Sequence, residues 1–318
     1  APSIHLALLI VLVLVLINEG SVGQIPIGAR PLGMGESFVA IADDANAISW
    51  NPAGLVQLRQ QAINGMYTDL YGIGLVHSYL SYILPLTDQH VIGIDWSSLG
   101  FEDEELNLRD NRMNLSYGIR LARQLSLGAN FRYVSIDTLL DGESLGPATG
   151  LGMDLGIYLE PISGLSFGIF GKDLTNTKVK FETTKREDVV AYRQFRLGAS
   201  YQLTDSSIIA CDLDDYLHLG AEQWFGSLLA LRGGIIGSVI SLDSPNSEET
   251  FREPISFSLG GSLKYGVLQF DYAYLNSPTL SNTHRFSMAF GFDYNPTLID
   301  IGSIQLRDVL TSFYLQYE

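Results

Sequence analysis

Apolar and polar residues alternate one by one along most of the chain after Gln61. In Phe195–Leu203, Phe, Leu, Ala, Tyr and Leu occupy every second position, and Arg, Gly, Ser and Gln lie between them. Leu125–Tyr133, Ile255–Tyr265 and Arg285–Phe292 repeat the pattern. A period of two is typical of a strand with an apolar medium on one face and a polar medium on the other. The sequence therefore predicts an all-β protein.

The connections between these strands decide which kind of β protein to expect, since alternation alone fits a soluble sandwich equally well. Short turns are predicted at Pro85–Gln89, Ala122–Gln124, Pro161–Gly164, Thr204–Ser206, Gly226–Ser227 and Tyr265–Gly266. Longer polar loops are predicted at Gly100–Arg112, Asp137–Gly150, Thr175–Gln194, Val239–Pro254 and Asn276–Thr283. Tight turns on one side and long loops on the other indicate a transmembrane antiparallel up-and-down β-barrel, with about 14 strands. We assign it to residues 61–293.

Composition and aromatic placement favour the membrane over a soluble core. Only 17% of residues are charged, and the mean hydropathy is +0.16. Aromatic residues near strand ends are expected to form interfacial girdles, apolar at one end and hydrated at the other. They are Tyr67, Tyr71, Tyr79, Tyr82, Trp96, Tyr133, Tyr158, Trp224, Tyr265, Tyr272 and Tyr274.

The two ends of the chain differ from the barrel. Leu6–Ile17 is an apolar run of signal-peptide length, followed by small residues that suit cleavage before Gln24. Residues 1–23 are therefore predicted to be a signal peptide. After the last alternating strand, residues 294–318 are expected to form a C-terminal periplasmic extension, although Val309–Tyr317 is an alternative closing strand. An even strand count places both termini in the periplasm.

Gly28–Leu55 differs from the rest of the chain, with closely spaced glycines and a terminal Asn-Pro-Ala-Gly turn. We expect residues 24–60 to form a lumenal plug with a short helix. Phe38, Val39, Ile41 and Trp50, with Asn51 and Pro52, are its candidate binding residues, because apolar side chains inside a polar lumen suit a hydrophobic ligand.

Inward positions of the predicted strands carry ionisable residues of both signs in similar number. Such a mixture indicates an internal salt-bridge lattice that holds a plug, whereas a selective pore would more often show a ring of one sign. The expected lumen-lining charges are Asp95, Arg120, Arg132, Asp154, Lys172, Arg196, Asp212, Glu222, Arg232, Lys264, Asp271 and Arg285.

Other chemistry is weakly supported. The net charge of −16 and the lack of basic runs argue against nucleic acid. Gly142–Gly146 matches the Gly-x-Ser-x-Gly pattern but lies in a predicted loop, without the strand and helix that a nucleophile needs. The histidines lack metal-ligand spacing and are expected at the rim or in the lumen. Two acidic groups, Glu102–Glu105 and Asp212 with Asp214 and Asp215, are expected to be a solvated loop and a strand end that runs into a tight turn. Binding of a divalent cation by these carboxylates is the alternative. No catalytic residue, resident metal or cofactor is predicted.

The N-terminal block resembles a known family. Gly28–Gly35, Phe38–Asp44 and Trp50–Gly54 are similar to the N-terminus of the PorV/PorQ proteins, within the FadL-like, long-chain fatty-acid transporter group. Weaker similarity continues in Leu217–Glu222, Phe270–Tyr274 and Thr283–Ser287. The resemblance implies a non-enzymatic 14-stranded outer-membrane barrel with its N-terminal segment inside.

Two functions follow from that resemblance. The PorV-like one receives or shuttles exported proteins at the outer membrane in type IX secretion, with secretion components or secreted proteins as partners. The FadL-like alternative admits hydrophobic small molecules such as long-chain fatty acids, with a hydrophobic ligand or detergent in the lumen. Either version implies contact with outer-membrane lipid, lipopolysaccharide and the barrel assembly machinery.

Overall fold

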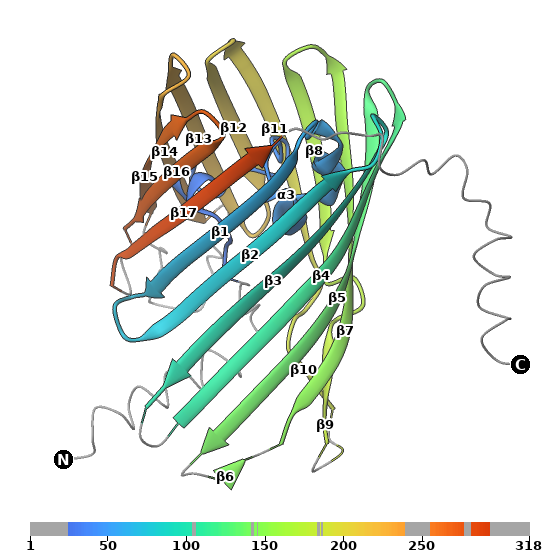
Figure 1. Ribbon diagram of the computed structural model, residues 1–318, viewed down its shortest axis with the longest axis vertical. Helices are drawn as coiled ribbons and strands as arrows, with labels where there is room; N and C mark the ends of the chain where they lie inside the picture. The colour runs from blue at the N-terminus through green and yellow to red at the C-terminus, as the bar shows by residue number, and fades with distance from the viewer. Residues whose placement is uncertain are drawn as a thin grey trace, which may run out of the picture.

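The computed structural model describes residues 25–103, 106–140, 143–144, 146–182, 185, 187–238, 255–276 and 281–292. Within these ranges, fourteen long antiparallel strands form a closed barrel (Figure 1). They are β1 (Gln61–Leu70), β2 (Leu75–Pro85), β3 (His90–Glu102), β4 (Leu106–Ala122), β5 (Leu125–Leu140), β7 (Ala148–Ile162), β8 (Leu165–Lys172), β11 (Gln194–Thr204), β12 (Ser207–Leu213), β13 (Tyr216–Phe225), β14 (Leu229–Ser238), β15 (Ser256–Tyr265), β16 (Leu268–Leu275) and β17 (Thr283–Phe292).

Closure is made by β1 and β17, which pair from Gln61 opposite Phe292 to Tyr67 opposite Phe286. The predicted barrel is confirmed, and the closing strand is β17 rather than the alternative Val309–Tyr317, which lies outside the described residues. The signal-peptide and C-terminal-extension predictions also concern residues outside the described ranges. The start of β1, the end of β17 and the six predicted short turns all lie at one rim.

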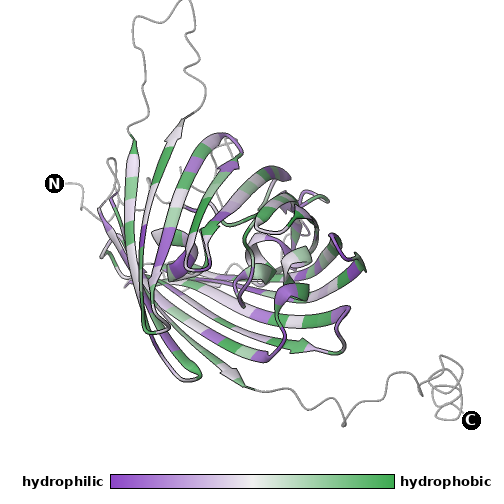
Figure 2. Cartoon of the chain, turned by 90° about the horizontal axis from the view of Figure 1, so that it is seen from above, coloured by the Kyte–Doolittle hydropathy of each residue, from purple (hydrophilic) through white to green (hydrophobic). Residues whose placement is uncertain are grey.

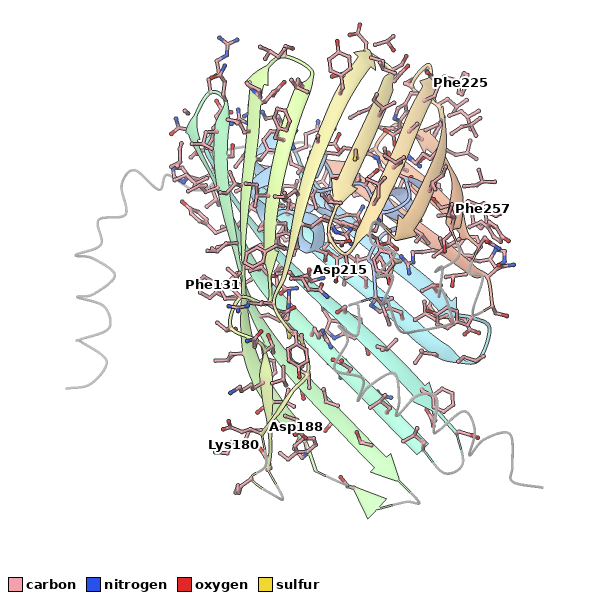
Figure 3. The ribbon with its side chains drawn as sticks, turned by 180° about the vertical axis from the view of Figure 1, so that it is seen from behind. Phe131, Lys180, Asp188, Asp215, Phe225 and Phe257 are labelled. Carbon is pink, nitrogen blue, oxygen red and sulfur yellow. The ribbon has the colours of Figure 1, made fainter. Side chains whose placement is uncertain are left out.

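The strands place apolar side chains outward and polar side chains inward. Phe131, Phe225 and Phe257 are exposed on the outer face (Figure 3), and the hydropathy colouring shows the alternation along each strand (Figure 2). Inward positions such as Asn130 and Ser258 are buried. Because a bilayer cannot satisfy unpaired backbone groups, closure of the sheet is what allows this apolar exterior to contact lipid.

Three aromatic residues do not belong to the predicted girdles. Tyr79, Tyr158 and Trp224 point inward, because each shares the parity of inward polar neighbours along its strand. Tyr79 donates from its hydroxyl to Asp95, and the Trp224 indole donates to Glu222. Position near a strand end therefore does not suffice, and strand parity decides which medium an aromatic ring meets.

The barrel is taller on one side. β3, β4, β5 and β7 extend past the other strands and meet three short strands, β6 (Glu143–Ser144), β9 (Lys178–Phe181) and β10 (Glu187–Val189) (Figure 1). The predicted loops Gly100–Arg112 and Asp137–Gly150 are thus largely strand, and Thr175–Gln194 contains β9 and β10, which corrects the sequence prediction.

The reason is that the polarity of the two faces inverts in this extension. Many outward residues there are polar, whereas several inward residues are apolar and pack together. The outward set includes Glu102, Arg109, Asp137, Lys178 and Lys180, and the inward set Val134, Ile136, Ala148, Val179 and Phe181. The outward charges made these segments resemble loops in the sequence. A strand also carries outward charges where its outer face contacts water instead of lipid.

The wall changes course between β8 and β9. β7 pairs with β8 up to Gly171 and with β9 from Lys178, and the residues between them turn onto the inner face of β7. Asp173 and Asn176 have φ of +52° and +50°, a conformation that Asp and Asn tolerate better than most residues. Buried Asp173 and Thr177 are thereby placed inside the barrel.

Residues 25–57, called the internal segment below, lie inside the barrel (Figure 2). The segment contains α2 (Ala29–Gly33), α3 (Ala47–Trp50) and the 3₁₀ helix η1 (Pro52–Gln57). It bonds to strands around the whole circumference, including β4, β5, β7, β11, β12, β13, β15 and β17. In the described part of the chain, no helix is long and apolar enough to span a membrane.

Glycines on the inner wall allow this close contact. A Cβ on Gly128 would overlap the backbone of Pro52 and Ala53, and one on Gly234 would overlap the backbone of Gly35. The wall glycines that face the segment in this way are Gly118, Gly128, Gly156, Gly168, Gly198, Gly220, Gly234 and Gly260. The polar side of each strand is therefore shaped to the internal segment.

Candidate functional site in the barrel interior

Arg30 of α2 is the central polar anchor of the internal segment. Its Nε and Nη2 donate to the two carboxylate oxygens of Glu222 on β13, at 2.8 and 2.9 Å. Its Nη1 donates to Asp43 and Asp44. Arg232 on β14 donates from Nε to the same Glu222 at 2.5 Å. All three side chains, Arg30, Glu222 and Arg232, are buried. Removal of one charge would therefore leave its partner buried without compensation, which destabilises the fold.

A second network lies on the inner wall of the barrel and connects β3, β4, β5, β7 and the residue that follows β8. Arg132 donates to Asp154 at 2.5 Å, to Asp173 at 2.6 Å and to the side-chain oxygen of Asn114 at 3.0 Å. Asn114 in turn donates to Asp95 at 2.8 Å. Of the predicted charges, Asp154 pairs directly with Arg132, and Asp95 is linked to it through Asn114. Asp173, which was not predicted, ties the residues that follow β8 to the neighbouring strands.

Asp212 and Asp214 hold the other side of the internal segment. One carboxylate oxygen of Asp212 accepts from the backbone N–H groups of Phe38 and Val39, both at 2.9 Å. Asp214, in the β12–β13 turn, accepts from Arg196 Nε at 2.7 Å and lies 3.1 Å from His218 Nε2. Burial alone would raise the pKa of Asp214, but the His218 hydrogen bond and the Arg196 charge outweigh it and lower that pKa to about 2.

The apolar candidates of the segment form a packed core. Phe38, Val39, Ile41 and Trp50 are buried together with Met34, Phe170 and Ala210. Asn51 donates to the carbonyl oxygens of Val39 and Ile157, at 2.9 and 3.0 Å, and its side-chain oxygen accepts from Ala53 N–H. Pro52 is buried at the N-terminus of η1. Of these six candidates, Trp50 alone lines the cavity described next.

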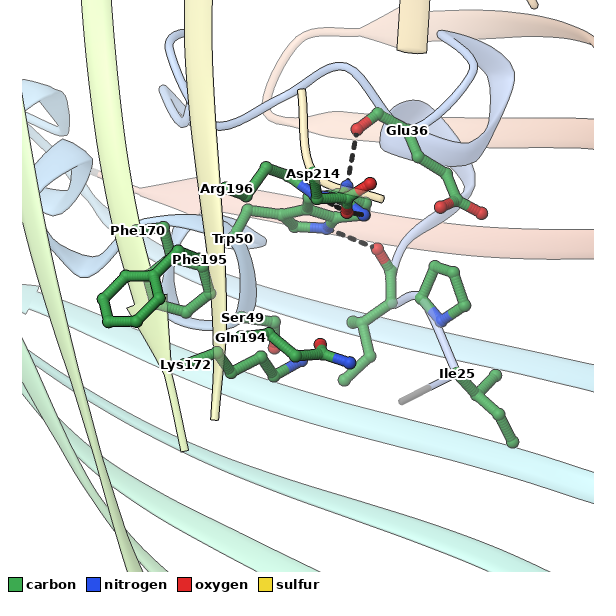
Figure 4. Close-up of a pocket in the computed structure, with 12 residues that line it drawn as sticks. Ile25, Glu36, Ser49, Trp50, Phe170, Lys172, Gln194, Phe195, Arg196 and Asp214 are labelled. Carbon is green, nitrogen blue, oxygen red and sulfur yellow. Dashed lines mark hydrogen bonds and ion pairs between the residues drawn. The ribbon is translucent and has the colours of Figure 1, made fainter. Parts of the chain in front are cut away.

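That cavity has a volume of about 70 Å³ and lies between the internal segment and the ends of β8 and β11 (Figure 4). Its lining residues are Ile25, Pro26, Ile27, Glu36, Ser49, Trp50, Phe170, Lys172, Gln194, Phe195, Arg196 and Asp214. The Arg196 guanidinium stacks over the Trp50 ring at 5.3 Å, and the indole N–H donates to the Ile27 carbonyl oxygen at 2.8 Å. Because β8 ends and β11 begins there, the cavity is on the long-loop side of the segment.

The remaining predicted lumen charges are placed differently from one another. Arg120 donates to the Val56 carbonyl oxygen at 2.6 Å, and buried Asp271 accepts from Gln269. Arg285 is fully buried, yet its Nε and Nη1 have no hydrogen-bond partner among the residues that the structure describes. Lys264 shares the inward parity of Ser262 on β15 but is exposed, because it lies beside the β15–β16 turn at the rim.

The other motifs contribute no chemistry to this site. Ser144 lies on short β6 and is exposed, and its Oγ accepts from the N–H of Gly146. His77 and His218 are buried inside the barrel, and His90 and His284 lie at the rims, at the starts of β3 and β17, where each contacts a tyrosine, so these four histidines are placed as expected. Among the described residues, no group of three His, Cys, Asp or Glu side chains is arranged to hold a metal ion.

Sequence reasoning missed most of the cavity. Glu36, Ser49, Phe170 and Gln194 line it but were not candidates. Strand parity alone identifies Phe170 as inward, since it lies two residues from the inward Gly168. For Glu36 no local signal existed: it adopts φ of +65°, and its place follows from the path of the internal segment.

Solved structures with a similar architecture include hydrocarbon channels and transporters. The structure is similar to the CymD monoaromatic hydrocarbon channel, with a TM-score of 0.62, 15% identity, and coverage of 84% of this chain and 98% of that one. For the Pseudomonas putida toluene transporter TodX the values are 0.62, 13%, 85% and 99%. For a Pseudomonas aeruginosa FadL homologue they are 0.53, 12%, 86% and 99%. The chain has a FadL-like barrel fold.

At these identities the likeness concerns the fold. No protein-family model and no curated protein sequence matches the chain. The FadL-like part of the sequence resemblance is consistent with the structural neighbours, while the PorV/PorQ assignment stays a prediction. What the structure adds is an internal segment bonded to the wall on all sides and a small cavity on its long-loop side.

Proposed function

We propose that this protein passes hydrophobic small molecules across the outer membrane of a Gram-negative cell, with both chain ends in the periplasm. The observation that carries the proposal is the cavity walled by Trp50 and Phe170, set against a segment that occupies the barrel interior. The lining combines these aromatic walls with six polar or charged side chains, and convergent polar groups beside apolar walls are typical of sites that select small ligands. An open aqueous pore would instead leave the lumen free for water.

The fold likeness supports the same function. The similar structures are described as monoaromatic hydrocarbon channels, toluene transporters and a FadL homologue. The protein-secretion function that the N-terminal motif favoured draws no support from these structures, and we retain the FadL-like alternative as the main proposal.

Uptake of a labelled hydrocarbon tests the proposal. The mature chain would be expressed in a Gram-negative host that lacks its own hydrocarbon channel, and entry of radiolabelled toluene would be compared with the empty vector. We expect faster uptake with the wild type and slower uptake with Trp50→Ala, because that change removes one wall of the cavity. Gly65→Ala is the matched control, since a Cβ at Gly65 meets nothing closer than 3.9 Å. Vector-level uptake from a correctly folded wild-type barrel would refute the function.

A further inference from the structure

The inner face of the barrel carries an unpaired guanidinium where the first and last strands meet. Arg285 on β17 is fully buried, and its Nε and Nη1 have no hydrogen-bond partner in the described part of the chain. Thr68 on β1 lies beside it, because the Thr68 hydroxyl donates to the carbonyl oxygen of His284 at 2.7 Å. His77 on β2 lies opposite Thr68 in the β1–β2 ladder. The buried side chains of Arg285, Thr68 and His77 therefore form a row across β17, β1 and β2.

His77 adds a second unused donor to this row. It is buried, and its Nδ1, which donates when it carries the ring proton, has no partner among the residues described. The Thr68 hydroxyl proton is already used by the His284 carbonyl oxygen. Buried polar groups are hydrogen-bonded in the great majority of cases. Two neighbouring residues with unused donors thus indicate an acceptor that the described residues do not supply.

Within the described ranges, no carboxylate forms an ion pair with Arg285. Glu36 is the carboxylate whose charge acts on Arg285, but it lies 4.0 Å from Nδ1 of His218. A guanidinium stays protonated in proteins, so Arg285 keeps its charge inside the barrel. Because an uncompensated buried charge is costly, a ligand that supplies a negative charge here would stabilise the fold.

The charges around His77 favour an anion at the same place. Those that act on its ring belong to Arg285, Arg112 and Lys172, and all three are cations. Arg112 is paired with Asp110 at 2.7 Å, whereas Lys172 has no ion pair with another described residue. The whole chain carries a net charge of −16, so the positive surroundings of His77 are a local property.

Enclosure restricts the ligand to a small ion. Arg285, Thr68 and His77 expose 2%, 1% and 5% of their surfaces, which excludes an alkyl chain or an aromatic ring beside the guanidinium. None of the three lines the cavity at Trp50, so this site is separate from the one assigned to hydrophobic molecules. Phosphate brings up to two charges and several strong acceptor oxygens, more than one guanidinium and one imidazole can satisfy.

We propose that Arg285 and His77 bind a monovalent inorganic anion of about the size of chloride on the inner face of the barrel. The ion accepts hydrogen bonds from the Arg285 guanidinium and from Nδ1 of His77, and it compensates the buried positive charge. Since β1 pairs with β17 to close the barrel, an ion held by β17 and β2 bridges the closing seam. This site goes beyond the transport function and does not depend on it.

The NMR line width of the chloride signal tests the site, because exchange with a protein-bound ion broadens that signal. The purified full barrel in mild detergent would be titrated with bromide or with gluconate, a bulky monovalent anion. We expect the wild type to broaden the chloride signal, and we expect bromide but not gluconate to reverse the broadening. No excess broadening, or equal reversal by the two anions, would overturn the proposal without requiring any variant.

Variants locate the ion. Arg285→Met removes the charge and should weaken chloride binding about tenfold or more, since hydrogen bonds to charged groups are the stronger class. His77→Phe removes the second donor and should weaken binding less than Arg285→Met does. Lys264→Met is the matched control, because it removes an exposed charge beside the β15–β16 turn and should leave binding unchanged. Unchanged affinity in folded Arg285→Met protein would assign the broadening to other cations and overturn the proposal.

The unfolding temperature gives an independent readout. In gluconate, Arg285→Met should unfold at a higher temperature than the wild type, because it removes an uncompensated buried charge. Replacing gluconate by chloride should raise the unfolding temperature of the wild type and leave that of Arg285→Met unchanged, since a ligand stabilises only a state that binds it. The same response to chloride in both proteins would refute the site.

Discussion

Arg30 and Glu222 form a two-hydrogen-bond ion pair, at 2.8 and 2.9 Å, between the internal segment and strand β13. The pair is buried, and Glu222 also receives Arg232. Glu222 thus accepts hydrogen bonds from one guanidinium of the segment and from one of the wall. The segment is held as a charged part of the barrel rather than as a loose apolar insert.

Removal of the shared carboxylate should loosen both elements. Glu222→Ala leaves Arg30 and Arg232 buried without this acceptor, for which we expect a loss of about 3–5 kcal/mol. The temperature at which the barrel unfolds on a gel in SDS measures it. Asp88→Ala is the control: it removes the exposed pair with Arg59 and should cost under about 1 kcal/mol. Equal effects of the two changes would contradict the anchoring role.

Asn51 should be sensitive to a change of one atom. Its amide N–H groups donate to the carbonyl oxygens of Val39 and Ile157, so Asn51→Asp places a carboxylate against two acceptors. We expect Asn51→Asp to destabilise the barrel more than Asn51→Ala, which itself should cost about 1–3 kcal/mol through the unpaired buried groups. Thermal unfolding of the purified barrel gives the comparison, and the reverse order would show that the amide hydrogens are not the important contact.

Substitution of an inner-wall glycine should change the conductance of the barrel by displacing the internal segment. Gly128→Ala places a methyl group into the backbone of Pro52 and Ala53 and should displace the internal segment, raising single-channel conductance in a planar bilayer. Deletion of residues 24–50 should raise conductance further. Gly65→Ala, where the nearest atom is 3.9 Å away, should leave conductance unchanged. Low conductance in the deletion variant would mean that the segment does not occlude the pore.

Protonation of Asp214, in the β12–β13 turn, should cause a structural transition at acidic pH. Its pKa is lowered to about 2 in the folded protein, so its stabilising effect is fully present above the ordinary aspartate pKa of ~4 and is lost as pH falls toward 2. Because Arg196 joins Asp214 to the Trp50 ring, tryptophan fluorescence should show a step as pH falls below about 4. Asp214→Asn should remove this step, and a step that persists in the variant would assign it to other groups.

The sequence by itself determined the barrel. Alternating residues such as those of Phe195–Leu203 specify strands with one apolar face, and the short turns specify which ends meet. Both properties are local, because side-chain direction alternates with every residue in any strand. The same parity assigns Arg132, Asp154 and Glu222 to the interior.

Only the tertiary structure decided which interior residues meet. Arg30 reaches Glu222 across 192 positions of sequence, and Lys172 joins Ser49 and Gln194 because the internal segment passes the ends of β8 and β11. No periodicity encodes such contacts, since they depend on where an irregular segment lies inside a closed wall. The strands of the tall extension were missed for a related reason. Apolar residues of the extension pack on the inner face, so the polar residues lie outward, which is the opposite of the arrangement in a membrane strand.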